Sequence, residues 1–119
     1  MGYAVVRRGD EVETFAGVIR LLRRALDVTG FGVNEFVLPP GYVGREHDEA
    51  EFEQEEVYLA LEGSGTVTID GEVEIPFETG TYVRVDPASS RLIVAGPEGL
   101  RFVVIGGVPG GIFTPRSVL

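Results

Sequence analysis

Short apolar runs separated by turn-forming residues dominate the pattern of this sequence. The runs are rich in β-branched and aromatic residues, and several alternate apolar with polar positions, which is the period of a half-buried strand. Between them stand clusters of glycine, proline, aspartate and serine, the residues that favour tight turns. We therefore predict strands within residues 3–7, 31–38, 57–61, 66–69, 72–76, 81–85, 91–95 and 100–105.

The turn signals differ in strength. Asp70-Gly71 is the strongest, because both central positions of a type I′ hairpin turn favour positive φ and Asp-Gly suits them. A hairpin is therefore predicted between the runs 66–69 and 72–76. Further turns are predicted where glycine, proline or serine interrupts an apolar run, at residues 39–41, 63–65, 79–80, 86–90 and 96–99.

Residues 17–27 follow a helical period instead. Apolar residues recur at three- and four-residue spacing, at Val18, Ile19, Leu22, Ala25 and Leu26. Arginines 20, 23 and 24 fall on the opposite side of such a helix. We predict a short amphipathic helix that ends near Gly30, with its arginines solvated.

Many short strands at spacings of roughly 8–12 residues, with one short helix, are typical of an antiparallel barrel or jelly roll. Closure of such a barrel also removes exposed strand edges. We predict an all-β single domain over residues 1–119. Its parts are an N-terminal arm with the short helix (1–30), a barrel core (31–107) and an irregular tail (108–119), which Ile112 and Phe113 are expected to pin to the body.

Composition and charge narrow the classes of function. The chain has 119 residues, 44% of them hydrophobic, which suffices for one core, and no apolar run approaches the ~20 residues of a membrane span. The N-terminus lacks the apolar core of a signal peptide, so we expect a cytoplasmic protein without a membrane partner. The absence of cysteine excludes thiolate metal sites and cysteine nucleophiles. A formal net charge of −9 makes nucleic acid an unexpected partner.

Residues 44–65 hold the candidate chemistry. They contain the single histidine, His47, in an acidic run that leads into an apolar strand opened by Glu56. We expect Glu56 to point into a polar pocket, because a carboxylate beside an apolar run needs partners. His47 is either a surface histidine whose pKa the acids raise, or a ligand or acid–base residue of a pocket. The other acids of the loop are expected to be solvated: Glu46, Asp48, Glu51, Glu53 and Glu55.

Other reactive arrangements are absent or ambiguous. The sequence contains no G-x-S-x-G elbow, no P-loop and no H-x-x-x-H pair. Phe36, Tyr58 and Tyr82 are expected in the core or in a pocket wall. Arg91 and Arg101 either bind a ligand carboxylate through two parallel hydrogen bonds or form internal salt bridges.

The segments PPGYVGREHDEAEFEQEEVYLALEGSG, TVTIDGE and PFETGTYVRVDPASSRLIVAGPEGLRFVVIGG together resemble the cupin superfamily, in particular its small single-domain members. The resemblance covers residues 31–107. It implies two motifs, G-x5-H-x-H-x3,4-E-x6-G and G-x5-P-x-G-x2-H-x3-N. In metal-binding cupins three histidines and one glutamate of these motifs hold a divalent metal inside the barrel.

The chain departs from those motifs at the ligands. Glu56 and Gly63 match the glutamate and glycine of the first motif, and His47 matches its first histidine. Glu49 takes the place of the second histidine, with a longer spacing to the glutamate than the motif has. Gly80 resembles the glycine of the second motif, and the position of that motif's histidine falls on Arg91. A guanidinium there would repel a dication and pair naturally with Glu56.

Two functional hypotheses of different class follow. The preferred one is a cupin barrel that binds a small polar or acidic organic molecule without metal turnover, oriented by His47, Glu56 and Arg91 between walls that include Tyr58 and Phe36. The alternative is a metal-dependent oxygenase or isomerase with one Fe, Mn, Zn or Ni ion on His47, Glu49 and Glu56. A scaffold without ligand is a third possibility. The resemblance also implies a homodimer, which the predicted strand 3–7 would support.

Overall fold

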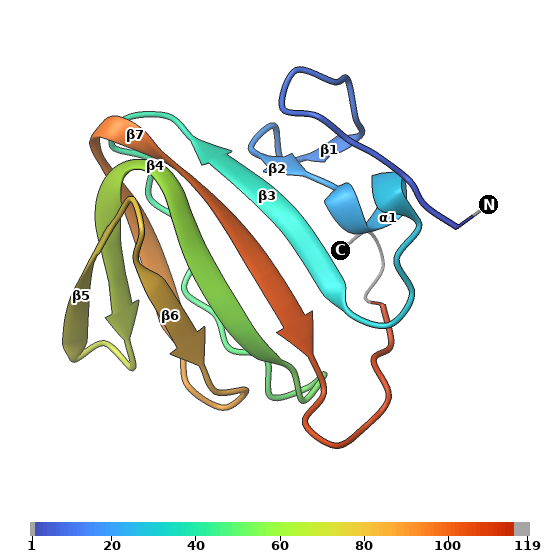
Figure 1. The fold of residues 1–119 in the computed structure, drawn as a ribbon. Helices are drawn as coiled ribbons and strands as arrows, with labels where there is room; N and C mark the ends of the chain where they lie inside the picture. Colours follow the sequence, from blue (N-terminus) through green and yellow to red (C-terminus); the bar gives the residue numbers. More distant parts are fainter. Residues whose placement is uncertain (1, 116–119) are drawn as a thin grey trace.

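The structure, a computed structural model that describes residues 2–115, is mostly antiparallel β-sheet with one short helix (Figure 1). The predicted all-β fold class is confirmed. The elements in chain order are β1 (Thr14–Phe15), β2 (Ile19–Arg20), α1 (Leu22–Leu26), β3 (Gly32–Leu38), β4 (Glu55–Ile69), β5 (Val73–Glu78), β6 (Tyr82–Val85) and β7 (Arg91–Gly107). No helix within residues 2–115 has the length and hydropathy needed to cross a membrane.

Two long, bent strands, β4 and β7, run side by side and join the two layers of the barrel (Figure 1). The first half of β4 lies between β7 and β6, and its second half lies between β7 and β5. On the far side of β7 the sheet continues through β3 and β2 to β1. Each long strand therefore contributes to both layers, so that its inward side chains reach one shared interior.

Aromatic side chains fill the interior between the layers. Phe102 on β7 stacks on Phe36 with ring centroids 4.8 Å apart and meets the edge of Phe77 at 5.6 Å. Phe77 and Phe102 are almost fully buried, as are Tyr58 and Val67 on β4. The burial of alternate residues along β4 and β7 is what the period of a half-buried strand predicts.

The predicted turns at residues 63–65 and 96–99 are wrong, because β4 and β7 continue through both segments. The glycines serve a close approach between these strands instead. A Cβ on Gly63 would lie 2.1 Å from the carbonyl oxygen of Gly99, and one on Gly65 would lie 2.3 Å from that of Val94. The register of the β4–β7 pair shifts at this place, as in a β-bulge, and the strands bend there.

Replacing Gly65 with alanine is expected to destabilise the protein by about 1–3 kcal/mol, because a new methyl group must push backbone away in a packed region. Urea unfolding monitored by circular dichroism would measure the loss. Gly30→Ala is the matched control, since its Cβ would meet nothing within 4 Å. Equal stability of the two variants would contradict the close-approach explanation.

The N-terminal predictions need correction. Residues 3–7 form no strand, and the helix covers only α1, because Ile19 and Arg20 pair with β3 as β2. A tight turn with positive φ at Ala16 and Gly17 joins β1 to β2, and Asp27, also at positive φ, ends the helix. Arg20 is not solvated as predicted, since its guanidinium forms an ion pair with Glu35 at 2.5 Å.

The predicted hairpin turn at Asp70-Gly71 is confirmed. Asp70 and Gly71 have φ values of 51° and 68°, and the amide of Glu72 donates to the carbonyl of Ile69 at 3.0 Å, as in a type I′ turn. In the tail Phe113 is buried, as predicted. Ile112 is 89% exposed, so the prediction that it attaches the tail to the body is wrong. The division of the domain at residues 30 and 107 stays a prediction, and tail residues 116–119 lie outside the described part of the chain.

Candidate functional site

A cavity of about 330 Å³ lies between the two layers of the barrel. The residues that line it come from β2 and the turn before it, β3, β4, β7 and the segment 42–49, together with Gln54 and Phe113. Six of the residues that the sequence singled out as ligand or metal candidates are among them: Phe36, His47, Glu49, Glu56, Tyr58 and Arg91. The backbone thus brings together candidates that lie far apart in the sequence.

His47 and Glu49 reach the cavity because the loop before β4 folds back along β7. His47 forms an isolated bridge with Arg91, with backbone hydrogen bonds of 3.1 and 2.8 Å between the two residues. The amide of Glu49 donates to the carbonyl of Pro87 at 2.9 Å. The acids around them, such as Glu46 and Glu51, are exposed, as predicted for a solvated run.

Glu56 enters the cavity from the start of β4. It shares the inward face of that strand with Tyr58, whose hydroxyl donates to Glu56 Oε1 at 2.8 Å. Opposite Glu56, β7 has Gly106, where a Cβ would lie 3.4 Å from Glu56 Cγ and 3.0 Å from Gln54 Oε1. Gly106 therefore makes room for two polar side chains. Neither Gly106 nor the buried Gln54 was predicted as part of the site, because only the pairing of β4 with β7 places them there.

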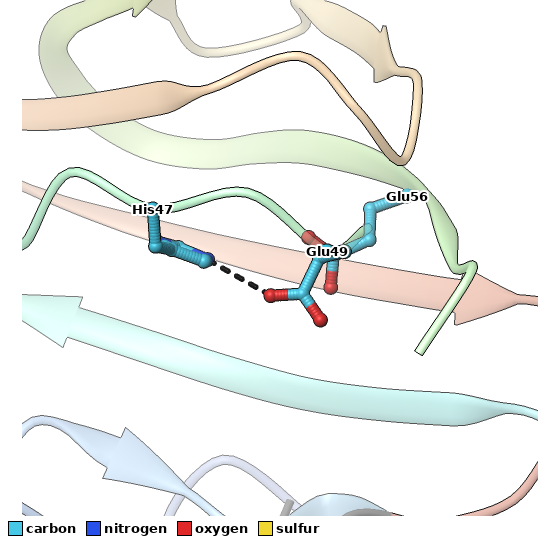
Figure 2. A group of neighbouring side chains, drawn as sticks. All are labelled: His47, Glu49 and Glu56. Atoms are coloured by element: carbon cyan, nitrogen blue, oxygen red, sulfur yellow. Dashed lines mark ion pairs between the residues drawn. The ribbon is translucent and has the colours of Figure 1, made fainter. Parts of the chain in front are cut away.

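His47, Glu49 and Glu56 converge at one point. Each offers one donor atom, and these atoms all lie within 4.8 Å of one another. Figure 2 shows the imidazole of His47 directed at the carboxylate of Glu49, with Nε2 and Oε2 3.2 Å apart, and the carboxylate of Glu56 beside them. The side chain of Glu49 is 1% exposed and that of His47 is 31% exposed, so the carboxylate lies away from bulk water while the imidazole is partly accessible.

Arg91 supplies positive charge behind this group. Its side chain is fully buried, and Nη2 lies 3.8 Å from Glu56 Oε1. The same nitrogen donates to the backbone carbonyl of Asp86 at 3.3 Å, whereas Nε and Nη1 have no hydrogen-bond partner within residues 2–115. Arg101, the other arginine considered, pairs with Glu35 at 2.9 Å outside the cavity. Tyr82 is also outside, 70% exposed, so its predicted place in the core or pocket wall is wrong.

Proton affinities in the site are raised. The hydrogen bond to Glu49 raises the pKa of His47, although burial opposes it. Burial raises the pKa of Glu56, the charge of Glu49 adds to the rise, and Tyr58 and Arg91 oppose it. Burial also raises the pKa of Tyr58 well above its usual value, so its hydroxyl stays a donor. Without a bound cation, Glu56 and His47 therefore bind protons more tightly than the same groups do in water.

The contribution of Glu56 and His47 to the stability of the metal-free protein is expected to fall as pH rises above about 4. Unfolded glutamate and histidine titrate near pH ~4.3 and ~6.5. In the folded protein the pKa values of Glu56 and His47 are raised above these unfolded pKa values. Each group therefore stabilises the folded protein fully when the pH is below its unfolded pKa, and this stabilisation is lost as pH rises through its folded pKa. Thermal unfolding in EDTA, compared with Glu56→Gln, would measure this. A wild-type minus variant difference that stays constant across this pH range would contradict it.

Comparison with known proteins gives two curated sequence relatives, which are named as different enzymes. No family model matches the chain. It is 44% identical over 73 residues to the dimethylsulfoniopropionate lyase DddW of Ruegeria pomeroyi, a match that covers 60% of this chain and 43% of the lyase. It is 40% identical over 80 residues to a glucose-6-phosphate isomerase of Pyrococcus horikoshii, covering 58% and 42%. The chain thus spans less than half the length of the curated relatives that it matches.

Solved structures match over nearly the whole chain. A cupin protein of Bacteroides fragilis superposes with a TM-score of 0.76 at 27% identity and covers 99% of this chain and 94% of its own. A cupin 2 conserved barrel domain protein of Salinispora arenicola has a TM-score of 0.70 at 20% identity, covering 92% and 91%. With the two-layered barrel and its interior His/Glu/Glu group, these matches show that the chain belongs to the cupin superfamily.

Proposed function

We propose that this protein binds one divalent first-row metal ion through His47, Glu49 and Glu56 and, with it, a small acidic organic molecule as the substrate of a metal-dependent reaction. The observation that carries the proposal is the convergence of three donor atoms within 4.8 Å inside the cavity. The names of the two sequence relatives, a lyase and an isomerase, favour catalysis over storage or scaffolding. Both matches cover only part of those enzymes, so neither name transfers a substrate.

The donor set fits such an ion. One imidazole and two carboxylates are ligands of Mn²⁺, Fe²⁺, Co²⁺, Ni²⁺ and Zn²⁺. At metal–ligand distances of about 2.0–2.2 Å, two ligands of one ion lie at most about 4.4 Å apart. The observed spread of up to 4.8 Å therefore needs only small side-chain rotations. The His47–Glu49 pair would exchange its shared proton for the cation, as metal binding generally requires.

Arg91 need not exclude the ion, because it offsets Glu49. Relative to the motif of three histidines and one glutamate, Glu49 adds one negative charge and Arg91 adds one positive charge. With a dication, and with His47 neutral, both sets carry a single net positive charge. Arg91 lies 3.8 Å from Glu56 and donates to a backbone carbonyl, so it accompanies the ligand set without replacing a ligand.

The chain's own residues prepare the site for chemistry. A bound ion would supply Lewis-acid polarisation of a ligand oxygen. Tyr58 holds the carboxylate of Glu56 by its hydrogen bond, and Arg91 stabilises the negative charge of that carboxylate. Apolar side chains line much of the cavity, and charge interactions are stronger beside such walls than in bulk water.

The second candidate is binding of the same class of molecule without metal. The buried Glu56–Arg91 pair favours it, because that pair already leaves neither charge alone. His47, Glu56 and Arg91 would then orient the ligand. The two candidates differ in one measurable property, the metal content.

Metal analysis separates the candidates. Untagged protein, stripped with chelator and dialysed against each of Mn²⁺, Fe²⁺ (without oxygen), Co²⁺, Ni²⁺ and Zn²⁺, is expected to retain about one ion per chain by mass spectrometry. The Co²⁺ form should show visible absorption from a protein-bound ion. Failure to retain any of these ions would overturn the metal proposal and favour the metal-free candidate.

A further inference from the structure

The polar side chains of the cavity gather at one end. Tyr58 and Arg91 both contact Glu56, and His47 contacts Glu49 within the same group. Gln54 joins them across Gly106. An incoming molecule therefore meets charge and hydrogen-bonding groups at this end, where the proposed metal lies.

The remaining wall is mainly apolar. Phe36 and Phe102 stack face to face at 4.8 Å on neighbouring strands. Around them lie aliphatic and aromatic side chains, namely Val18, Ile19, Leu38, Ile93, Val104 and Phe113. Asn34 and Arg45 are polar exceptions on this wall, along with the hydroxyl of Tyr42. The wall thus offers contact area and few hydrogen-bonding partners.

We infer that the ligand is a monocarboxylate with an apolar body, preferably aromatic, and not a sugar or sugar phosphate. This inference rests on the proposed metal site, because the single net positive charge of that site matches one carboxylate. The hydroxyls of a sugar would lose water against the apolar wall without gaining partners. A phosphate dianion would bring two negative charges to a ligand set that carries one net positive charge with its metal bound. A cavity of about 330 Å³ suits a molecule of this small size.

Calorimetric titration of the Mn²⁺-loaded protein tests the inference. We expect 3-phenylpropionate to bind about tenfold or more tightly than acetate, gluconate or glucose 6-phosphate, since removing apolar contacts in a pocket costs at least this factor. Phe36→Ser and, separately, Val18→Ser should reduce that preference while the metal content stays unchanged. Both side chains are only partly buried, so both variants are expected to fold.

The outcomes are distinguishable. Protein that takes up no metal overturns the proposed function itself. Metal-loaded protein that prefers gluconate or glucose 6-phosphate, shows no preference, or binds none of the four acids overturns the ligand class alone. Preference for 3-phenylpropionate that survives both serine variants would also overturn it, because the apolar wall would then not be the cause.

Discussion

Replacing Glu49 with glutamine is expected to lower the affinity for divalent metal by more than about 100-fold. Loss of a residue that merely orients a ligand costs about 10–100-fold in metal affinity. Glu49 is proposed as a ligand itself, and it is buried 3.2 Å from His47, so a larger loss should follow. Glutamine keeps the shape of the side chain but removes the negative charge. Competition with a fluorescent chelator measures the affinity, and Glu56→Gln and His47→Ala should behave alike.

The neighbouring acids provide the control for this experiment. Glu51→Gln and Glu53→Gln remove the same charge from exposed positions of the same segment. They are expected to change the metal affinity by less than about threefold, because exposed charges are screened by water and salt. If Glu49→Gln falls in the range of these two controls, Glu49 is not a ligand, and the proposed three-residue site is wrong.

Local sequence signals predicted most of the strands for a physical reason. Alternation of apolar and polar residues decides which face of a strand is buried, and the Asp70-Gly71 turn needs positive φ at both positions. The glycines at 63–65 and 96–99 were misread because a close approach of two strands and a turn both favour glycine. Only the pairing of β4 with β7 distinguishes the two cases.

The helix was predicted too long for a similar reason. Ile19 belongs to β2, yet it lies at a spacing from Leu22 that also fits a helical face. Its partner on β3, Phe36, is distant in sequence, and no local pattern reveals that pairing. Tertiary pairing therefore overrode a helical period that extended over only a few residues.

The site residues also differ in this respect: some could be recognised from the local sequence, and others only from the tertiary fold. Glu56 was recognisable because a carboxylate opens an otherwise apolar strand and Tyr58 follows on the same face. The burial of Glu49 was not, because an acid in an acidic loop resembles its exposed neighbours. Gln54 and Gly106 needed the strand register. The resemblance of the motif positions, rather than spacing alone, placed Arg91 beside Glu56.

Arg91→Met is expected to destabilise the metal-free protein by about 3–5 kcal/mol, because removing one partner of a buried ion pair leaves the other charge uncompensated. Arg91 is fully buried and Glu56 is largely so. Urea unfolding in EDTA measures this loss. Arg8→Met is the control: its ion pair with Glu62, 2.8 Å long, is exposed, so about 0–1 kcal/mol should be lost.

Metal and a second substitution should each reverse the effect of Arg91→Met. A bound dication supplies the missing positive charge beside Glu56, so Mn²⁺ should stabilise the variant more than it stabilises the wild-type protein. Adding Glu56→Gln removes the uncompensated charge and should recover part of the lost stability without metal. If neither treatment stabilises Arg91→Met beyond the matching change in wild type, the charge of Arg91 does not serve Glu56. Its role is then packing, and the charge balance that lets this cavity accept a dication must come from elsewhere.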